Sequence, residues 1–197
     1  MQEKDKFLRK INFILLLLLI FVSQKLVANN TNTELLDYNN KLNNSSALFI
    51  QTDGSTIEEG VVYIGFNRIK LEYKKPKEIT IVISEKKSMY VNHELKETQY
   101  FDTNKSIVKV FLTILTGQSF YEKSELDVSD DQISINTNLE INEIHYKTKI
   151  IYENDPIVLK KIIILENEEN IEIGLFNHNN LDALKKDFFS LINPYLN

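Results

Sequence analysis

The sequence predicts an α+β fold built around an antiparallel sheet, and two sets of short apolar runs carry that prediction. The first set lies between Gly54 and Gln99, where turn-type residues separate the runs. The second set lies in residues 118–178. Runs of about 4–8 β-branched and aromatic residues joined by short connections are typical of antiparallel strands. The expected strands are residues 61–66, 69–73, 79–84, 88–92, 133–135, 144–151, 157–165 and 171–176.

Alternation within residues 69–73 indicates a sheet with one apolar face and one polar, solvent-exposed face. Ile69, Leu71 and Tyr73 share one side, and Lys70 and Glu72 share the other. Such a sheet can curve around an apolar interior. Which side of residues 61–66 points inward stays open, because a shift of one residue in register exchanges the two faces.

Two helices are expected on this sheet. Residues 31–42 begin with a capping-box pattern, Thr-Asn-Thr-Glu, and then carry apolar residues at helical spacing. This short helix is expected to pack against the sheet. In residues 105–116, Lys105, Lys109 and Thr113 fall four apart, and apolar residues fill the rest of the circumference. That segment predicts a helix, ended by Gly117, that is covered on most sides or lies over an apolar concavity.

Residues 1–28 read as a secretory signal peptide, and they are excluded from the fold. Four basic residues precede an apolar run over residues 13–22, and Leu26-Val27-Ala28 follows. About 20 residues are needed to span a bilayer, so this run is too short for a membrane helix. Cleavage is expected near Ala28, with a retained anchor as the alternative, and residues 29–197 are expected to form a single domain.

Charge and cysteine content exclude several classes of partner. The chain has 23 Lys/Arg and 28 Asp/Glu, of which residues 1–28 hold five and two, so the remainder has 18 and 26. A net charge near −8 argues against nucleic acid and anionic lipid surfaces as standing partners. The chain has no cysteine. It therefore has neither a disulfide nor the lipidated cysteine of a lipoprotein.

No pattern for catalysis or cofactor binding is present. His93, His145 and His178 lie in different segments without metal-ligand spacing, and there is no nucleophile elbow or glycine-rich phosphate loop. The three neighbouring aspartates Asp127, Asp130 and Asp131 lack EF-hand spacing. The sequence therefore predicts a protein that is not an enzyme and that needs no metal or cofactor.

An ordered set of segments resembles the periplasmic outer-membrane lipoprotein carriers of the LolA type. It comprises Ala-Leu-Phe-Ile-Gln at residues 47–51, Glu-Glu-Gly at 58–60, Arg-Ile-Lys-Leu-Glu-Tyr at 68–73, Pro76, and Tyr-Val-Asn-His-Glu-Leu-Lys-Glu-Thr-Gln at 90–99. The order and spacing match over residues 34–116. The resemblance implies an incomplete, half-open antiparallel β-barrel covered by short helices. It also implies that residues 180–194 dock as a short strand, whereas their own apolar spacing is helical, so both alternatives stay open.

The resemblance implies a monomeric periplasmic chaperone that holds lipoprotein acyl chains in an apolar cavity. It would take lipoproteins from an inner-membrane releasing transporter and pass them to an outer-membrane acceptor. The first alternative is a binding module of the same fold for another lipid or hydrophobic ligand. The second is an anchored structural or interaction protein, or an enzyme whose site the sequence does not reveal. The residues expected to contact acyl chains are Phe49, Val62, Ile64, Ile69, Leu71, Tyr73, Ile81, Ile83, Met89 and Val91 on the sheet, and Phe111, Leu112 and Leu115 on the covering helix.

One departure from the family pattern bears on cargo handling. The family commonly has a basic residue and a proline before the strand that matches residues 68–73, and that basic residue is tied to closing the lid. Here Gly65-Phe66-Asn67 occupies the place. The lid-closing role is therefore not assigned to any residue of this chain.

Overall fold

The structure, a computed structural model, describes residue 31 and residues 33–117, 119–122, 124–167 and 169–196. The predicted signal peptide, residues 1–28, lies outside the described residues. Tyr38–Asn197 forms one compact unit, and the architecture below is the architecture of that unit.

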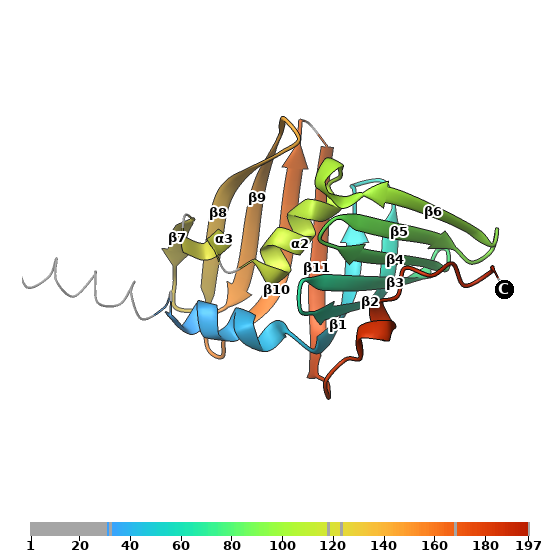
Figure 1. Ribbon diagram of the computed structural model, residues 1–197. Coiled ribbons are helices and arrows are strands. Elements are labelled where there is room, and N and C mark those ends of the chain that lie inside the picture. The colour runs from blue at the N-terminus through green and yellow to red at the C-terminus, as the bar shows by residue number, and fades with distance from the viewer. Residues whose placement is uncertain (1–30, 32, 118, 123, 168, 197) are drawn as a thin grey trace, which may run out of the picture. The chain divides into compact units, whose positions relative to one another are not determined.

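An eleven-stranded antiparallel sheet forms the unit, in the spatial order β6-β5-β4-β3-β2-β1-β11-β10-β9-β8-β7 (Figure 1). Its two edge strands, β6 and β7, do not pair with each other, so the barrel is incomplete. The sequence prediction of an α+β fold with a half-open, curved antiparallel sheet is confirmed. The strands are β1 (Ser45–Thr52), β2 (Ile57–Gly65), β3 (Arg68–Lys75), β4 (Ile79–Ser84), β5 (Lys87–Asn92), β6 (Glu97–Asp102), β7 (Glu125–Val128), β8 (Gln132–Ile141), β9 (Ile144–Glu153), β10 (Val158–Glu166) and β11 (Glu169–Asn180).

The sheet consists of two meanders joined at one seam. Strands β1 to β6 pair in chain order, as do β7 to β11, and the pairing of β1 with β11 joins them. The chain must therefore cross from the β6 edge to the β7 edge. It does so through η1 (Thr103–Lys105), α2 (Val108–Thr116) and α3 (Ser119–Glu122).

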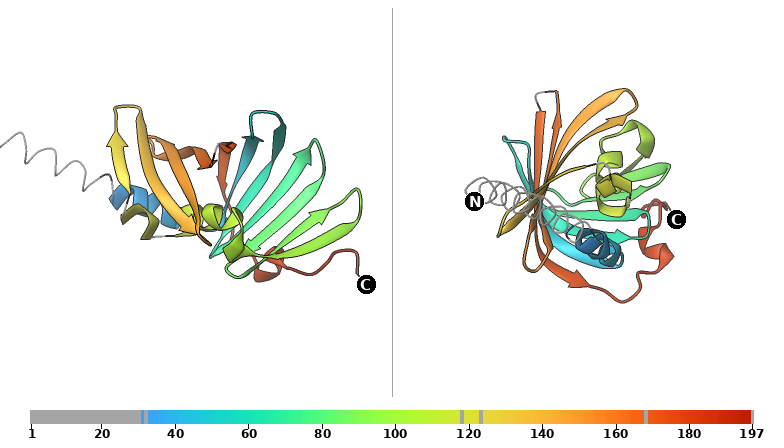
Figure 2. Two further views of the ribbon diagram at one scale, coloured as in Figure 1. Left: turned by 90° about the horizontal axis from the view of Figure 1, so that it is seen from above. Right: turned by 90° about the vertical axis from the view of Figure 1, so that its left-hand side faces the viewer.

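Helix α2 lies within the concavity of the sheet. It contacts β2, β3 and β4 of the first meander and β8 of the second. Strands so far apart in the sheet order can touch one helix only if the sheet curves around it, as Figure 2 shows. The face of the sheet that α2 covers is called the concave face below, and the opposite face is the outer face.

Both predicted helices are present. Residues 33–42 are helical, and on the part of this helix within the compact unit the Tyr38 hydroxyl accepts a hydrogen bond of 2.9 Å from the Leu159 amide of β10. The helix expected over residues 105–116 appears as η1 followed by α2. The Gly117 amide donates to the Thr113 carbonyl and ends α2. A Cβ at Gly117 would lie 2.4 Å from that carbonyl oxygen, so only glycine fits this close approach.

The chain after β11 crosses the outer face of the sheet. It forms neither the continuous helix nor the docked strand that the sequence left open for residues 180–194. Apart from the 3-10 helix η2 (Lys186–Phe189), residues 181–196 are neither helix nor strand. Phe189 is buried there against Val82, with Leu184 and Phe188 packed beside it. Farther along, the Tyr100 hydroxyl of β6 donates to the Leu191 carbonyl. This segment shields part of the outer face from solvent. The outer face is therefore polar and solvent-exposed only where the segment does not cover it.

No helix among the described residues is long and apolar enough to cross a membrane.

Candidate functional site

The strand registers bring eight of the ten predicted sheet residues onto the concave face. Across β2, β3 and β4, one row of paired residues contains Ile64, Ile69 and Ile83. The neighbouring rows on the same face hold the other five, Phe49, Val62, Leu71, Tyr73 and Ile81. The open question of register is thereby settled: Val62 and Ile64 of β2 point inward.

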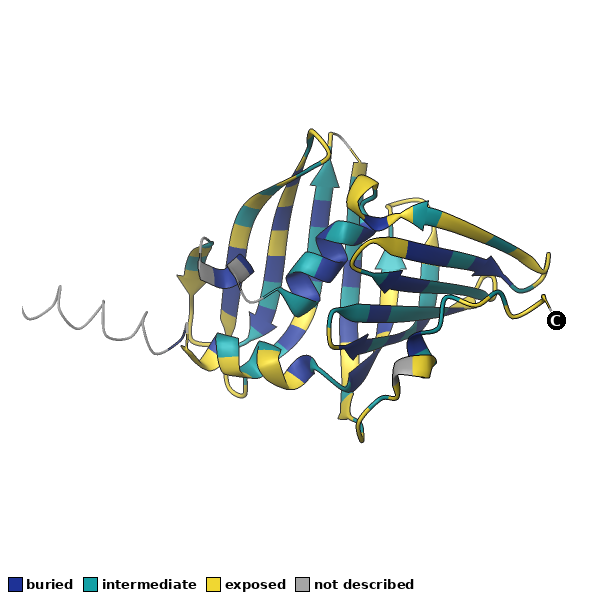
Figure 3. Cartoon of the chain, in the orientation of Figure 1, coloured by how far each residue is buried: buried dark blue, intermediate teal, exposed yellow. Residues whose placement is uncertain are grey.

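The three predicted residues of α2 are buried between the helix and the rest of the unit. Phe111, Leu112 and Leu115 are 8%, 4% and 5% exposed. In Figure 3, most of α2 and the centre of the sheet are coloured as buried or half-buried. Lys109 and Thr113 are only half-buried, as expected for the polar side of this helix. The structure therefore brings these α2 residues into the concavity that the eight sheet residues line.

Met89 and Val91 do not lie on the concave face. Met89 pairs with Val82 and Val91 with Thr80, on the outer face of β4 and β5. Both side chains are buried in the cluster that contains Phe189. The prediction that these two residues line the cavity is wrong, because apolar residues occupy the outer face wherever the C-terminal segment covers it.

The second meander supplies half of the concave face, and the sequence prediction missed it. Its inward side chains follow from the β8–β9, β9–β10 and β10–β11 registers. The alternation Tyr146, Thr148, Ile150, Tyr152 in β9 is the signal that could have identified them. The inward, buried apolar residues are Ile133, Ile135, Tyr146, Ile150, Tyr152, Leu159, Ile162, Ile164, Ile173 and Leu175.

Part of the concave face is left uncovered near the β6 edge. Along the row that begins with Ala47 and Val62, both buried, the next residues Leu71, Ile81 and Tyr90 are only half-buried. The apolar floor thus continues beyond α2 toward water. This uncovered row offers the place where an apolar ligand can first contact the concave face.

A hydrogen-bonded tyrosine pair links the C-terminal end of α2 to β9. The Tyr121 hydroxyl of α3 lies 3.0 Å from the Ile114 carbonyl and 2.9 Å from the Tyr152 hydroxyl of β9. The Ile114 carbonyl belongs to the last turn of α2, where carbonyls have no partner within the helix. Burial raises the pKa of both phenols above the ordinary value, so both stay neutral and able to donate.

A polar group marks the rim of the concave face on β1 to β3. The Tyr73 hydroxyl donates to Gln51 Oε1 (3.0 Å), and Gln51 Nε2 donates to Glu58 Oε2 (3.1 Å). Desolvation, together with the negative charge of Asp53, raises the pKa of the Glu58 carboxyl. The folded protein therefore binds a proton at Glu58 more tightly than the unfolded chain does.

We expect Glu58→Gln to stabilise the protein at pH 7. A raised pKa means that the contribution of Glu58 to stability is full below the unfolded-state pKa and is lost as the pH rises through the folded-state pKa. The amide oxygen that the substitution introduces can still accept from Gln51. Thermal unfolding followed by circular dichroism should give a higher Tm for the variant at pH 7 and equal Tm values near pH 4. Equal Tm values at both pH values would contradict the expectation.

The segment that departs from the family pattern is the turn between β2 and β3. A Cβ at Gly65 would lie 2.7 Å from the Phe189 ring, so the glycine lets the C-terminal segment pack onto this turn. Phe66 is 78% exposed, and Asn67 has a positive φ of 52°. The Asn67 amide donates to Glu85 Oε1 (2.7 Å) in the turn between β4 and β5. The turn is therefore fixed from outside the sheet and holds no basic side chain at residues 65–67.

Among the described residues, no three His, Cys, Asp or Glu side chains gather closely enough to hold a metal ion. His93 and His178 have structural partners. His93 Nε2 lies 2.8 Å from the Thr80 hydroxyl, and His178 Nε2 lies 2.8 Å from the Leu159 carbonyl.

Comparisons with known proteins show resemblance in fold only. No family model and no curated protein sequence matches this chain. Similar solved structures include an uncharacterised conserved protein from Thermus thermophilus, with 8% identity, a TM-score of 0.49, and coverage of 85% of this chain and 92% of that one. The Pseudomonas aeruginosa MucA/MucB complex has 10% identity and a TM-score of 0.46, and the match covers 82% of this chain and 60% of that one. LprF from Mycobacterium bovis has 10% identity and a TM-score of 0.37, and the match covers 80% of this chain and 98% of that one. Likenesses this weak transfer no ligand or activity.

Proposed function

We propose that this protein is a carrier that binds the acyl chains of lipoproteins on its concave face beneath α2. The observation that supports the proposal is a continuous apolar face that runs from beneath α2 to the half-buried row of Leu71, Ile81 and Tyr90. A face of this kind can take up a flexible apolar chain without any proton transfer or metal.

The covered part of the concave face must open for a long chain to enter. Ile69, Ile83 and Ile114 are fully buried, so an acyl chain can reach the floor there only if α2 moves away. Burial contributes about 0.8 kcal/mol per CH₂, and two or three fully engaged chains would bind too tightly to be released. Displacing α2 costs part of that free energy. The helix therefore lowers the net affinity to a range in which a carrier can release its cargo.

The finer parts of the proposal rest on the resemblance to the lipoprotein carriers. We propose a monomer in the periplasm that is not an enzyme and that moves lipoproteins from an inner-membrane releasing transporter to an outer-membrane acceptor. The second candidate is a binding module of the same fold for another lipid. It is favoured by the turn at residues 65–67, which lacks the basic residue and proline that the carrier family commonly has.

Mass spectrometry of the native protein purified from periplasm tests the proposal. We expect full-length triacylated lipoproteins to co-purify, and the N-terminus of the chain to lie near Asn29. Free phospholipid or glycolipid without protein would support the second candidate instead. Recovery of the intact chain in the membrane pellet only would contradict the free carrier. A matched preparation of the Phe111→Asp variant, changed on the buried side of α2, controls for nonspecific adsorption, because it should lose the co-purified lipoproteins.

A further inference from the structure

We infer that the edge of β8 is a docking site for an extended peptide of a partner protein that alternates apolar and acidic residues. The inference concerns residues 137–141 and the outer face beside them, and it is independent of the carrier function. Three observations carry it: an unpaired strand edge, apolar side chains on its concave side, and an unneutralised basic groove on its outer side.

The first observation is a difference in strand length. β8 has ten residues, Gln132–Ile141, and all of them pair with β9. β7 has only four residues, and it pairs with residues 133–136 of β8. Among the described residues, nothing pairs with the other edge of β8 from Thr137 to Ile141, and Figure 1 shows this edge running free above β7. A free edge presents N–H and C=O groups to which an added strand can bond.

The second observation is the apolar character of the concave side along this edge. Leu139 pairs with Tyr146, and Ile141 pairs with Ile144 at the hairpin end. Leu139 and Ile141 are half-buried, although Tyr146 beside them is buried. An added strand with apolar residues at alternate positions would cover these side chains and extend the apolar face by one strand.

The third observation is a basic groove on the outer face of β8, β9 and β10. Its volume is about 590 Å³, and Ile163 and Leu165 contribute apolar side chains to its lining. Register places Asn136 beside Lys149 and Asn138 beside Lys147, so two amides and two ammonium groups point the same way. A second hollow of about 420 Å³ shares Asn138, Lys147 and Leu165 and continues toward the end of the hairpin.

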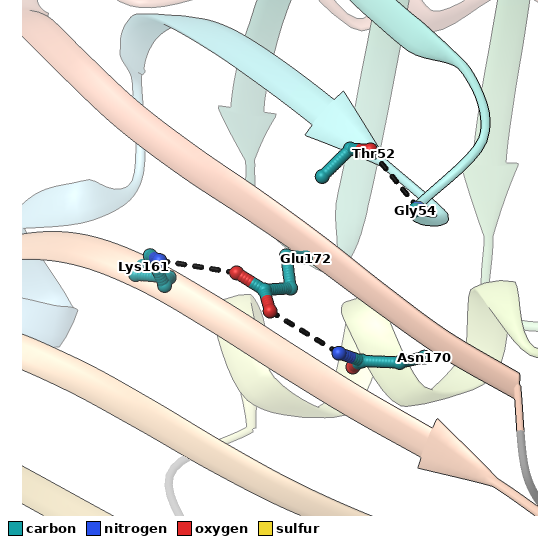
Figure 4. Close-up of polar contacts among 5 residues, drawn as sticks. All are labelled: Thr52, Gly54, Lys161, Asn170 and Glu172. Atoms are coloured by element: carbon teal, nitrogen blue, oxygen red, sulfur yellow. Dashed lines mark hydrogen bonds and ion pairs between the residues drawn. The ribbon is translucent and has the colours of Figure 1, made fainter.

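Neither lysine of this groove has an ion-pair partner among the described residues. The carboxylates around them are already engaged or lie farther away. Glu172 on β11 accepts from Lys161 and from Asn170, each at 3.1 Å (Figure 4), and Glu140 faces His145 at 3.9 Å. Glu125 lines the groove on the β7 side, but in the part of the chain that the structure describes it makes no ion pair with Lys149. The ammonium groups of Lys147 and Lys149, two residues apart on one face of β9, can therefore pair with the carboxylates of a bound ligand.

Geometry connects the groove to the edge. Neighbouring strands lie about 4.8 Å apart, so an added strand would lie about 10 Å from β9. The extended side chains of Lys147 and of a glutamate on the added strand can together bridge that separation, with Asn138 between them. Because the chain as a whole is acidic, with a net charge of −5, this groove is where an acidic peptide meets local attraction. The apolar and acidic requirements fall on opposite faces of the added strand, which is why the residues must alternate.

Fluorescence anisotropy with labelled heptapeptides tests the inference on the intact protein. The probe alternates valine and glutamate; one matched peptide carries glutamine for glutamate, and another carries N-methyl groups on the alternate amides that would face β8. We expect the glutamate peptide to bind at least about tenfold more tightly than either matched peptide. The double variant Lys147→Glu/Lys149→Glu should lose at least about tenfold in affinity for it.

The control variant Lys77→Glu/Lys105→Glu changes charge equally at two exposed lysines away from the groove, and its affinity should stay within about twofold. Equal binding of the N-methylated peptide would overturn strand addition, and equal binding by the Lys147/Lys149 variant would overturn the charge argument. Binding lost in Phe111→Asp but kept in the Lys147/Lys149 variant would place the peptide on the concave face and overturn the site. Sedimentation showing that two copies of the chain occupy the edge would also overturn it.

Discussion

Phe111→Asp is expected to abolish binding of a hydrophobic ligand while leaving the sheet formed. Phe111 is 8% exposed and lies on α2 within the concavity. A carboxylate there costs several kcal/mol when it is buried, and it opposes any acyl chain between the helix and the sheet. Every strand pair except β1–β11 joins neighbours in sequence, and α2 crosses the concave face without pairing with any strand. The helix can therefore loosen while the strands stay paired. A fluorescent fatty acid titration should show at least about a tenfold loss of affinity, with an unchanged β-sheet band in circular dichroism.

Two further variants keep this expectation falsifiable. Leu95→Asp places the same charge at a residue that is 64% exposed in the turn between β5 and β6, and it should bind as the native protein does. If Phe111→Asp unfolds, Phe111→Ala replaces it as a milder test. A folded Phe111→Asp protein with native affinity would contradict the role of α2 as a cover.

Gly60→Ala is expected to destabilise the protein by about 3 kcal/mol. An added Cβ would lie 2.2 Å from the Glu72 carbonyl oxygen and 2.7 Å from the Phe49 ring. Phe49 is 1% exposed and stacks edge-on against Tyr73 at 5.0 Å between ring centroids, so neither ring can move freely. Backbone and aromatic core must therefore shift together. Urea unfolding followed by circular dichroism measures the difference in the free energy of unfolding.

Gly174→Ala is the matched control for this prediction. Gly174 lies within β11, and a Cβ there would meet only the Ile50 carbonyl oxygen, at 3.9 Å. Alanine costs less conformational entropy than glycine in a strand, so this variant should be neutral or more stable by up to about 1 kcal/mol. Equal destabilisation in both variants would show that the close approach at Gly60 does not decide the result.

Strand periodicity predicted much of the fold because it reports local burial. Ile69, Leu71 and Tyr73 alternate with Lys70 and Glu72, and the structure places the first three on the concave face. Helix α2 was predictable for the same reason, because its polar residues share one side. In contrast, β1, β6 and β7 were not among the expected strands. The sequences of β6 and β7, Glu-Thr-Gln-Tyr-Phe-Asp and Glu-Leu-Asp-Val, lie at exposed edges and carry little apolar signal.

The position of Met89 and Val91 on the outer face and the free edge of β8 could not be predicted, because both depend on contacts between distant segments. Met89 and Val91 look like cavity residues until the C-terminal segment is seen to cover their face. Phe188 and Phe189 reach that face from nearly a hundred residues away. Similarly, the free edge of β8 depends on the unequal lengths of β7 and β8. These features follow from tertiary packing, which overrides the local pattern.

The seam between β1 and β11 has a consequence for folding while the chain emerges N-terminus first. Every other strand pair in the sheet joins neighbours in sequence, whereas Ser45 of β1 pairs with Asn180 of β11. The first meander can therefore form early, but the edge of β1 stays unpaired until nearly the whole remaining chain has emerged. Closing a loop of that length is slow, and an unpaired strand edge invites association with other chains. Leu48 and Ile50 of β1 stay partly exposed even after closure. The time between emergence of β1 and arrival of β11 is thus the interval in which this chain most needs protection from aggregation.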